Sequence, residues 1–240
     1  MPSTAQTRRL RVRLALAGGT TTSVAAIVGA LSVAAVGGDP VGAAIRSAVV
    51  LAAWLAWSLR SAHLHSGDTL GLAVVITLAR GVLVGVLAAF FMVPVALVPS
   101  TALAGVGLVA LALDGVDGAV ARRMGRASDF GGTLDMELDA WTVLLLSAMA
   151  WWLGRAGPWV LTAGLLRYAA LAAGALHPTF RRPLDARPAR RVVAGLAVGG
   201  LSVCLAAPLD GWPATALAAT VVVLLVHSFG RDAAIQWRSP

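Results

Sequence analysis

Long apolar stretches alternate with short polar segments along the whole chain. A helix rises about 1.5 Å per residue, so about 20 apolar residues cross the roughly 30 Å hydrocarbon core of a membrane. Gly81 to Leu113 carry no charge, and we divide them at "VPVALVPS", because proline lacks a backbone donor and favours a turn. The pattern then predicts eight spans, at residues 14–36, 42–60, 69–93, 97–122, 130–153, 158–177, 189–207 and 212–230.

The composition supports an all-α, polytopic integral membrane bundle. The chain is 58% hydrophobic and 12% charged, with a mean hydropathy of +0.83, whereas soluble domains average about 25% charged residues. The net charge is +8, but the arginines lie in short runs between spans, as the positive-inside rule describes. We therefore expect membrane lipids, and no nucleic acid, as partners. Cys204 is the single cysteine, which excludes a disulfide framework and predicts an inert, packed thiol.

The arginine runs also predict the topology. Five arginine-containing segments fall on one side of the eight spans, and the four other connections carry only Arg155. This bias places both termini, and the loop between the fourth and fifth spans, on the cytoplasmic side of a plasma (inner) membrane. The first apolar run continues to about Val36, too long for a signal-peptide core of about 7–15 residues, so we expect a retained span.

Two other features predict packing rather than chemistry. The G-x-x-x-G pairs at 81–85 and 195–199 permit close approach of helices. Tryptophans near the predicted span ends, including Trp54 and Trp57, are expected in the aromatic belts at the membrane interfaces.

The chain gathers its negative charge in "DGVDGAVARRMGRASDFGGTLDMELD", residues 114–139, which holds six of the 11 acidic residues. Residues three or four apart share a helix face, so Asp114 projects with Asp117, and Asp135 with Asp139. Glycines between the two pairs allow a tight return, and the pairs can meet at the ends of two antiparallel helices. Asp129 and Glu137 fall outside these two pairs, and we expect them to be solvated acids of a cytoplasmic loop that balance Arg122, Arg123 and Arg126.

Carboxylates this close repel one another, and a divalent cation removes that repulsion. All-oxygen ligands favour Mg²⁺, Mn²⁺ or Ca²⁺ over zinc. Two such ions, about 3.5–4 Å apart, serve in-line displacement at phosphorus. Gly118, Ala121 and Gly131 leave helix surface bare enough for a nucleotide or diphosphate to approach, and Arg122 can reach a phosphate oxygen.

The stretch reads Asp-x2-Asp-Gly-x2-Ala-Arg-x8-Gly-x3-Asp-x3-Asp. It resembles the signature of the CDP-alcohol phosphotransferase (CDP-alcohol phosphatidyltransferase) family, integral membrane enzymes of phospholipid synthesis. The resemblance extends over residues 69–230, which supply the six helices of such enzymes. It implies a catalytic domain at 69–240, preceded by an accessory segment with two additional spans at 1–68.

The resemblance also implies roles at the site. Asp114, Asp117 and Asp135 would be ligands of two Mg²⁺ or Mn²⁺ ions. Asp139 would be the general base for the acceptor hydroxyl and a member of the same metal-binding quartet. The predicted CDP site consists of Gly118, Ala121, Arg122 and Gly131, with Thr77 and Arg80 matching a Thr-x2-Arg that the family's first helix often carries.

Three arginines are candidates for the acceptor site. Arg167 lies about nine residues from either end of its span, where a charge costs roughly 2.5–3.5 kcal/mol and usually faces a cavity. A structural pair with Asp185 or with the quartet is its alternative role. Arg190 and Arg191 open the next span, where the resembled family commonly has a basic residue, and we expect one of them to bind an acceptor phosphate together with Arg167.

The expected reaction is transfer of a phosphatidyl group from CDP-diacylglycerol to a small alcohol, with release of CMP. The basic side chains favour an anionic acceptor, such as glycerol 3-phosphate or an inositol phosphate, over serine or a neutral alcohol, and the sequence does not distinguish among glycerophosphate, inositol phosphate, phosphatidylglycerol and serine. The resemblance implies a homodimer as the usual assembly.

A UbiA-like prenyltransferase would carry two acidic motifs in separate halves of the chain. A metal- or proton-coupled transporter would carry acids near the midplane. The single acidic cluster argues against both.

Overall fold

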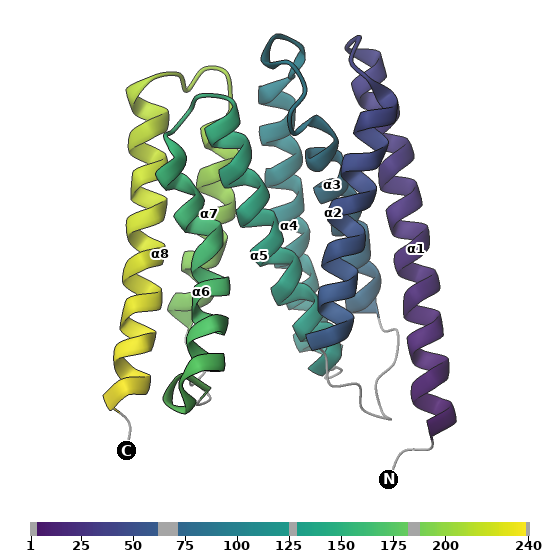
Figure 1. Cartoon of the computed structure of the whole chain (residues 1–240), viewed down its shortest axis with the longest axis vertical. Coiled ribbons are helices and arrows are strands. Elements are labelled where there is room, and N and C mark those ends of the chain that lie inside the picture. The colour runs from purple at the N-terminus through teal and green to yellow at the C-terminus, as the bar shows by residue number, and fades with distance from the viewer. Residues whose placement is uncertain (1–3, 62–71, 125–128, 182–187, 239–240) are drawn as a thin grey trace. The chain divides into compact units, whose positions relative to one another are not determined.

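The structure is a computed structural model, and it describes residues 4–61, 72–124, 129–181 and 188–238. These residues form helices and no strand, which confirms the predicted all-α class (Figure 1). The α-helices are α1 Thr4–Ala35, α2 Pro40–Ser61, α3 Leu72–Phe90, α4 Ser100–Met124, α5 Asp129–Trp152, α6 Thr162–Leu176, α7 Pro188–Leu205 and α8 Trp212–Arg238. The described residues also form the short 3₁₀ helices η1 Val95–Leu97, η2 Pro158–Leu161 and η3 Pro178–Arg181.

Each of the eight predicted spans corresponds to one α-helix, and η1 occupies the predicted break between the third and fourth spans. Among the described residues, four helical segments are long and apolar enough to cross a membrane: Val12–Ala35, Pro40–Arg60, Pro158–Leu176 and Trp212–Arg238. Large apolar side chains on α1 are exposed, among them Leu16 and Leu31 at 65% and 66%. Side chains of this kind are stable in lipid rather than in water. The protein is therefore a membrane helical bundle.

The described residues divide into two compact units. The first lies within Met1–Pro99 and Val109–Asp139, and the second within Ser100–Leu108 and Ala140–Pro240. The long helices α4 and α5 each contribute to both units.

The turn between α1 and α2 follows from the sequence "GGDP". Gly37 has a φ of +80°, a conformation that suits glycine, and the Gly38 N–H donates to Val33 O at 2.9 Å. The Asp39 carboxylate then accepts hydrogen bonds from the N–H groups of Val41 and Gly42 at 2.9 and 3.0 Å. This N-cap begins α2, with proline in the first helical position.

In the first unit, α1, α2 and α3 pack on one another (Figure 1). The glycines of the predicted G-x-x-x-G pair face the other two helices. A Cβ at Gly85 would lie 2.5 Å from Ala25 Cβ and 2.9 Å from Leu51 Cδ1. The Ser47 hydroxyl also donates to Gly85 O at 2.5 Å. The absence of a side chain at position 85 therefore permits the contact of all three helices.

In the second unit, α7 and α8 pack on each other, and α6 also contacts α8. The Cys204 side chain is fully buried, and its thiol donates to Ala214 O at 3.3 Å. This confirms a packed thiol. The backbone of α5 lies so close to Gly164 that a Cβ there would overlap Leu144.

The close contact at Gly85 predicts a change in stability. Gly85→Ala should lower the free energy of unfolding by about 1–3 kcal/mol, because the added methyl group has no space. The matched control is Gly19→Ala, at a position in α1 where a Cβ meets nothing within 4 Å. This control should be neutral, or stabilise by up to about 1 kcal/mol, because alanine favours the helix. Thermal unfolding of both variants in detergent measures the difference, and equal stability would contradict the described packing.

Candidate functional site

Two helices bring three carboxylates together in the first unit. Asp114 lies on α4, and Asp135 and Asp139 lie one turn apart on α5. One carboxylate oxygen from each lies within 4.8 Å of the other two. The three side chains are 28–31% exposed, so small ions and polar substrates can reach them.

The fourth predicted ligand and three residues of the predicted CDP site fall on the last turns of α4. The backbone of these residues is helical, but their side chains lie outside the described part of the structure: Asp117, Gly118, Ala121 and Arg122. Gly131 is described on the first turn of α5, four residues before Asp135.

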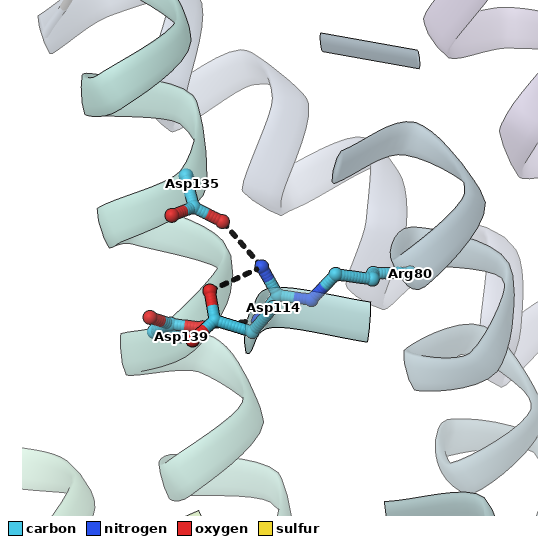
Figure 2. A network of polar contacts seen from close by, with 4 residues as sticks. All are labelled: Arg80, Asp114, Asp135 and Asp139. Carbon is cyan, nitrogen blue, oxygen red and sulfur yellow. Dashed lines mark hydrogen bonds and ion pairs between the residues drawn. The ribbon is translucent and has the colours of Figure 1, made fainter. Parts of the chain in front are cut away.

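Arg80 reaches from α3 into the group of aspartates (Figure 2). Its Nη1 lies 3.0 Å from Asp114 Oδ1 and also pairs with Asp135 Oδ1. Its Nη2 lies 2.5 Å from Asp139 Oδ1. The Arg80 side chain is only 4% exposed, so one guanidinium joins all three carboxylates from their buried side.

This position of Arg80 adds to what the sequence predicted. The resemblance placed Arg80 in a CDP site beside Thr77, which lies one turn earlier on α3 and is buried. The spacing of residues does not indicate that Arg80 pairs with the aspartates, because the contact joins α3 to α4 and α5 across 34 to 59 residues. The position of Arg80 inside the predicted apolar span at 69–93 is the signal that could have suggested an acidic partner, because a charge in such a span is usually paired.

The three aspartates fit a divalent metal site. Their donors are all carboxylate oxygens, which hard cations such as Mg²⁺ prefer. Oxygen ligands lie about 2.0–2.6 Å from these ions, and the 4.8 Å limit on the oxygen separations is compatible with a shared ion. Three carboxylates face one guanidinium, and the resulting excess of negative charge favours binding of a further cation.

Glu137 is a further residue that the sequence did not assign to the site. It lies between Asp135 and Asp139 on α5 but is only 2% exposed, so the prediction of a solvated carboxylate is wrong. Its Oε2 accepts a hydrogen bond from Trp57 Nε1 on α2 at 3.1 Å. A buried carboxylate needs such a donor, and the predicted placement of Trp57 in an aromatic belt did not anticipate this contact.

The three arginines predicted at the acceptor site all belong to the second unit. Arg167 is partly buried on α6. Arg190 on α7 forms an ion pair with Asp232 on α8, with Nε and Oδ2 2.8 Å apart. Arg191 is exposed beside it. Asp185, the alternative partner of Arg167, lies outside the described residues.

Comparison with known proteins supports an assignment at the level of family. A family model described as CDP-alcohol phosphatidyltransferase matches residues 70–230, which include α3 to α7, part of α8 and the aspartates Asp114, Asp135 and Asp139. No curated protein and no solved structure matches the chain. The matched region covers more than half of the 240 residues. The chain therefore belongs to the CDP-alcohol phosphatidyltransferase family, the enzymes that transfer a phosphatidyl group from a CDP-alcohol.

Proposed function

We propose that the protein transfers a phosphatidyl group from CDP-diacylglycerol to the hydroxyl group of a small alcohol. The acceptor oxygen forms a bond to the phosphatidyl phosphorus, and the bond from that phosphorus to the bridging oxygen of CMP breaks. CMP leaves with the bridging oxygen. The observation that supports this proposal most strongly is the convergence of Asp114 with Asp135 and Asp139 around Arg80.

The proposed metal ligands are Asp114, Asp117, Asp135 and Asp139, which would hold two Mg²⁺ or Mn²⁺ ions. Bound there, the ions would supply Lewis-acid stabilisation for the diphosphate and for the charge that develops on CMP. The partial exposure of the three described aspartates supports this role, because a diphosphate must reach the ions from solvent or from the membrane surface.

Asp139 is the proposed general base. A carboxylate close to the acceptor hydroxyl can accept its proton as the new bond to phosphorus forms. The Asp139 Oδ1 atom is held by Arg80 at 2.5 Å, which orients the carboxylate and leaves Oδ2 as the candidate proton acceptor.

Arg80 is proposed to interact both with the aspartates and with the substrate. In the structure it neutralises part of the charge of the three aspartates, and with a CDP-alcohol bound it would contact the diphosphate. The rest of the CDP site is proposed to comprise Thr77, Gly118, Ala121, Arg122 and Gly131. The small residues on consecutive turns of α4 and α5 would let the nucleotide approach the helix backbone.

The acceptor is proposed to be an anionic alcohol, such as glycerol 3-phosphate or an inositol phosphate. Arg167, with Arg190 or Arg191, would bind its phosphate group. Arginine suits this task because its planar guanidinium can bind phosphate through two parallel hydrogen bonds. The ion pair of Arg190 with Asp232 supports a fixed guanidinium at this position.

We also propose that residues 69–240 form the catalytic domain and residues 1–68 an accessory segment. The family match from residue 70 onward supports this division. The distribution of arginine supports a site at the cytoplasmic face of the inner membrane, with both termini on the same side.

The central prediction concerns Asp114 and Asp139. With CDP-diacylglycerol, an acceptor and Mn²⁺ or Mg²⁺, Asp139→Asn should lower the rate of CMP release about 10²–10⁴-fold, because the amide cannot accept the proton. Asp114→Asn should also abolish most of the activity through loss of a metal ligand. The matched control is Asp39→Asn, because asparagine preserves the N-cap of α2. Release of CMP by both site variants at the wild-type rate would contradict the proposal.

A second prediction concerns the counter-charge that Arg80 supplies. Arg80→Gln leaves three carboxylates without their cation, so the metal-free protein should lose about 1–3 kcal/mol of stability. This is less than the roughly 3–5 kcal/mol of a fully buried pair, because the aspartates are partly exposed. Thermal unfolding in EDTA and in Mn²⁺ measures the effect. Mn²⁺ should raise the Tm of the variant more than that of the wild type, and an equal increase would contradict this role.

A third prediction separates acceptor binding from donor binding. Arg167→Gln, and either Arg190→Gln or Arg191→Gln, should raise the KM for an anionic acceptor about tenfold or more, because a hydrogen bond to a charged group is lost. The KM for CDP-diacylglycerol should change little. The matched control is Arg13→Gln on α1, whose side chain is exposed. An unchanged acceptor KM in all three site variants would contradict the proposed acceptor site.

A further inference from the structure

The α1–α2 hairpin lies outside the region that matches the family model, which begins at residue 70. Nevertheless, α2 is joined to two of the helices that carry the site. It contacts α3 beside Arg80, and it contacts α5 between Asp135 and Asp139. The two contacts come from Trp54 and Trp57, which are three residues apart and therefore share a face of α2.

The contact with α3 is a close one. Trp54 is fully buried, and its Cζ3 atom lies 3.4 Å from the position that a Cβ at Gly81 would occupy. Gly81 directly follows Arg80, so the indole packs against the backbone beside the arginine. Hydrogen bonds fix α2 to the same helix farther along: Arg46 donates to Ala89 O at 2.8 and 3.1 Å, and Ser47 donates to Gly85 O.

The contact with α5 is a hydrogen bond to a buried carboxylate. Trp57 Nε1 lies 3.1 Å from Glu137 Oε2, and Glu137 is 2% exposed. Residues two apart on a helix point to different faces. Glu137 therefore holds α5 from the side away from its aspartates, while Asp135 and Asp139 point to Arg80.

A metal site depends on such support, because ligands must be held within about 0.5 Å of their working positions. The distance between Arg80 on α3 and the two aspartates on α5 is set by how these helices are held together. α2 contacts α3 at Gly81, next to Arg80, and contacts α5 at Glu137, between the two aspartates.

We propose that the α1–α2 hairpin is a positioning element of the metal site, in which the Trp57–Glu137 hydrogen bond sets the place of Asp135 and Asp139 relative to Arg80. This inference rests on the proposed function of the aspartates as metal ligands. Trp57 and Glu137 act through α5, and neither contacts substrate or metal.

The test is the Kd for Mn²⁺ of the purified full chain, measured by titration with the electron paramagnetic resonance signal of free Mn²⁺. Trp57→Phe removes the indole N–H and keeps an aromatic ring, and it should raise the Kd about two- to tenfold, the equivalent of one hydrogen bond. The matched control is Trp212→Phe, at an 81% exposed position on α8, and it should bind as the wild type does. A merely structural defect would lower the number of sites per chain and leave their Kd unchanged.

A double-mutant cycle separates the hydrogen bond from the charge of Glu137. Glu137→Met removes the acceptor, and in that background Trp57→Phe should have no further effect on the Kd. Trp57→Phe with a wild-type Kd, or the same increase of Kd with and without Glu137, would overturn the inference.

Asp139→Asn distinguishes this failure from failure of the proposed function. If the wild type binds Mn²⁺, Asp139→Asn binds it weakly and Trp57→Phe binds it as the wild type does, only the role of the hairpin is overturned. If the wild type does not bind Mn²⁺, or Asp139→Asn binds it equally well, the metal site itself is overturned and the inference with it.

Discussion

The arrangement of the first unit depends on the attraction between one guanidinium and three carboxylates. Asp114, Asp135 and Asp139 would repel one another if they stood alone, and Arg80 holds them together from the buried side. Burying an arginine is costly unless it is paired in this way. The ion-pair group therefore ties α3 to α4 and α5, and it collects the oxygen atoms that a divalent ion requires.

The helices around this group supply its rigidity. Small residues on α3 let α1 and α2 approach its backbone, and Gly85 shows the closest of these contacts. The turn at Asp39 returns the chain tightly enough for α2 to pack beside α1. As a result, two helices outside the family match lie against the matched helix that carries Arg80.

The hydrophobic pattern predicted the helices well, because a membrane requires apolar runs of a fixed length. The i,i+3 and i,i+4 spacings also predicted that the aspartates would share helix faces, and the structure brings Asp114 together with Asp135 and Asp139. Contacts between distant segments were not predictable in this way. Arg80 matched a motif, but the motif did not indicate its three aspartate partners. The position of Trp57 near a span end predicted an interfacial tryptophan, whereas in the structure it donates a hydrogen bond to Glu137. Periodicity determines the face on which a residue lies, but not the helix that packs there.

The most direct test of the account is to locate Mn²⁺ in the protein by anomalous X-ray scattering from crystals grown with CDP-diacylglycerol and Mn²⁺. The account predicts two Mn²⁺ peaks about 3.5–4 Å apart, ligated by oxygen atoms of Asp114, Asp135 and Asp139. Mn²⁺ peaks that lie elsewhere in the molecule, with these three aspartates bound only to Arg80, would contradict it.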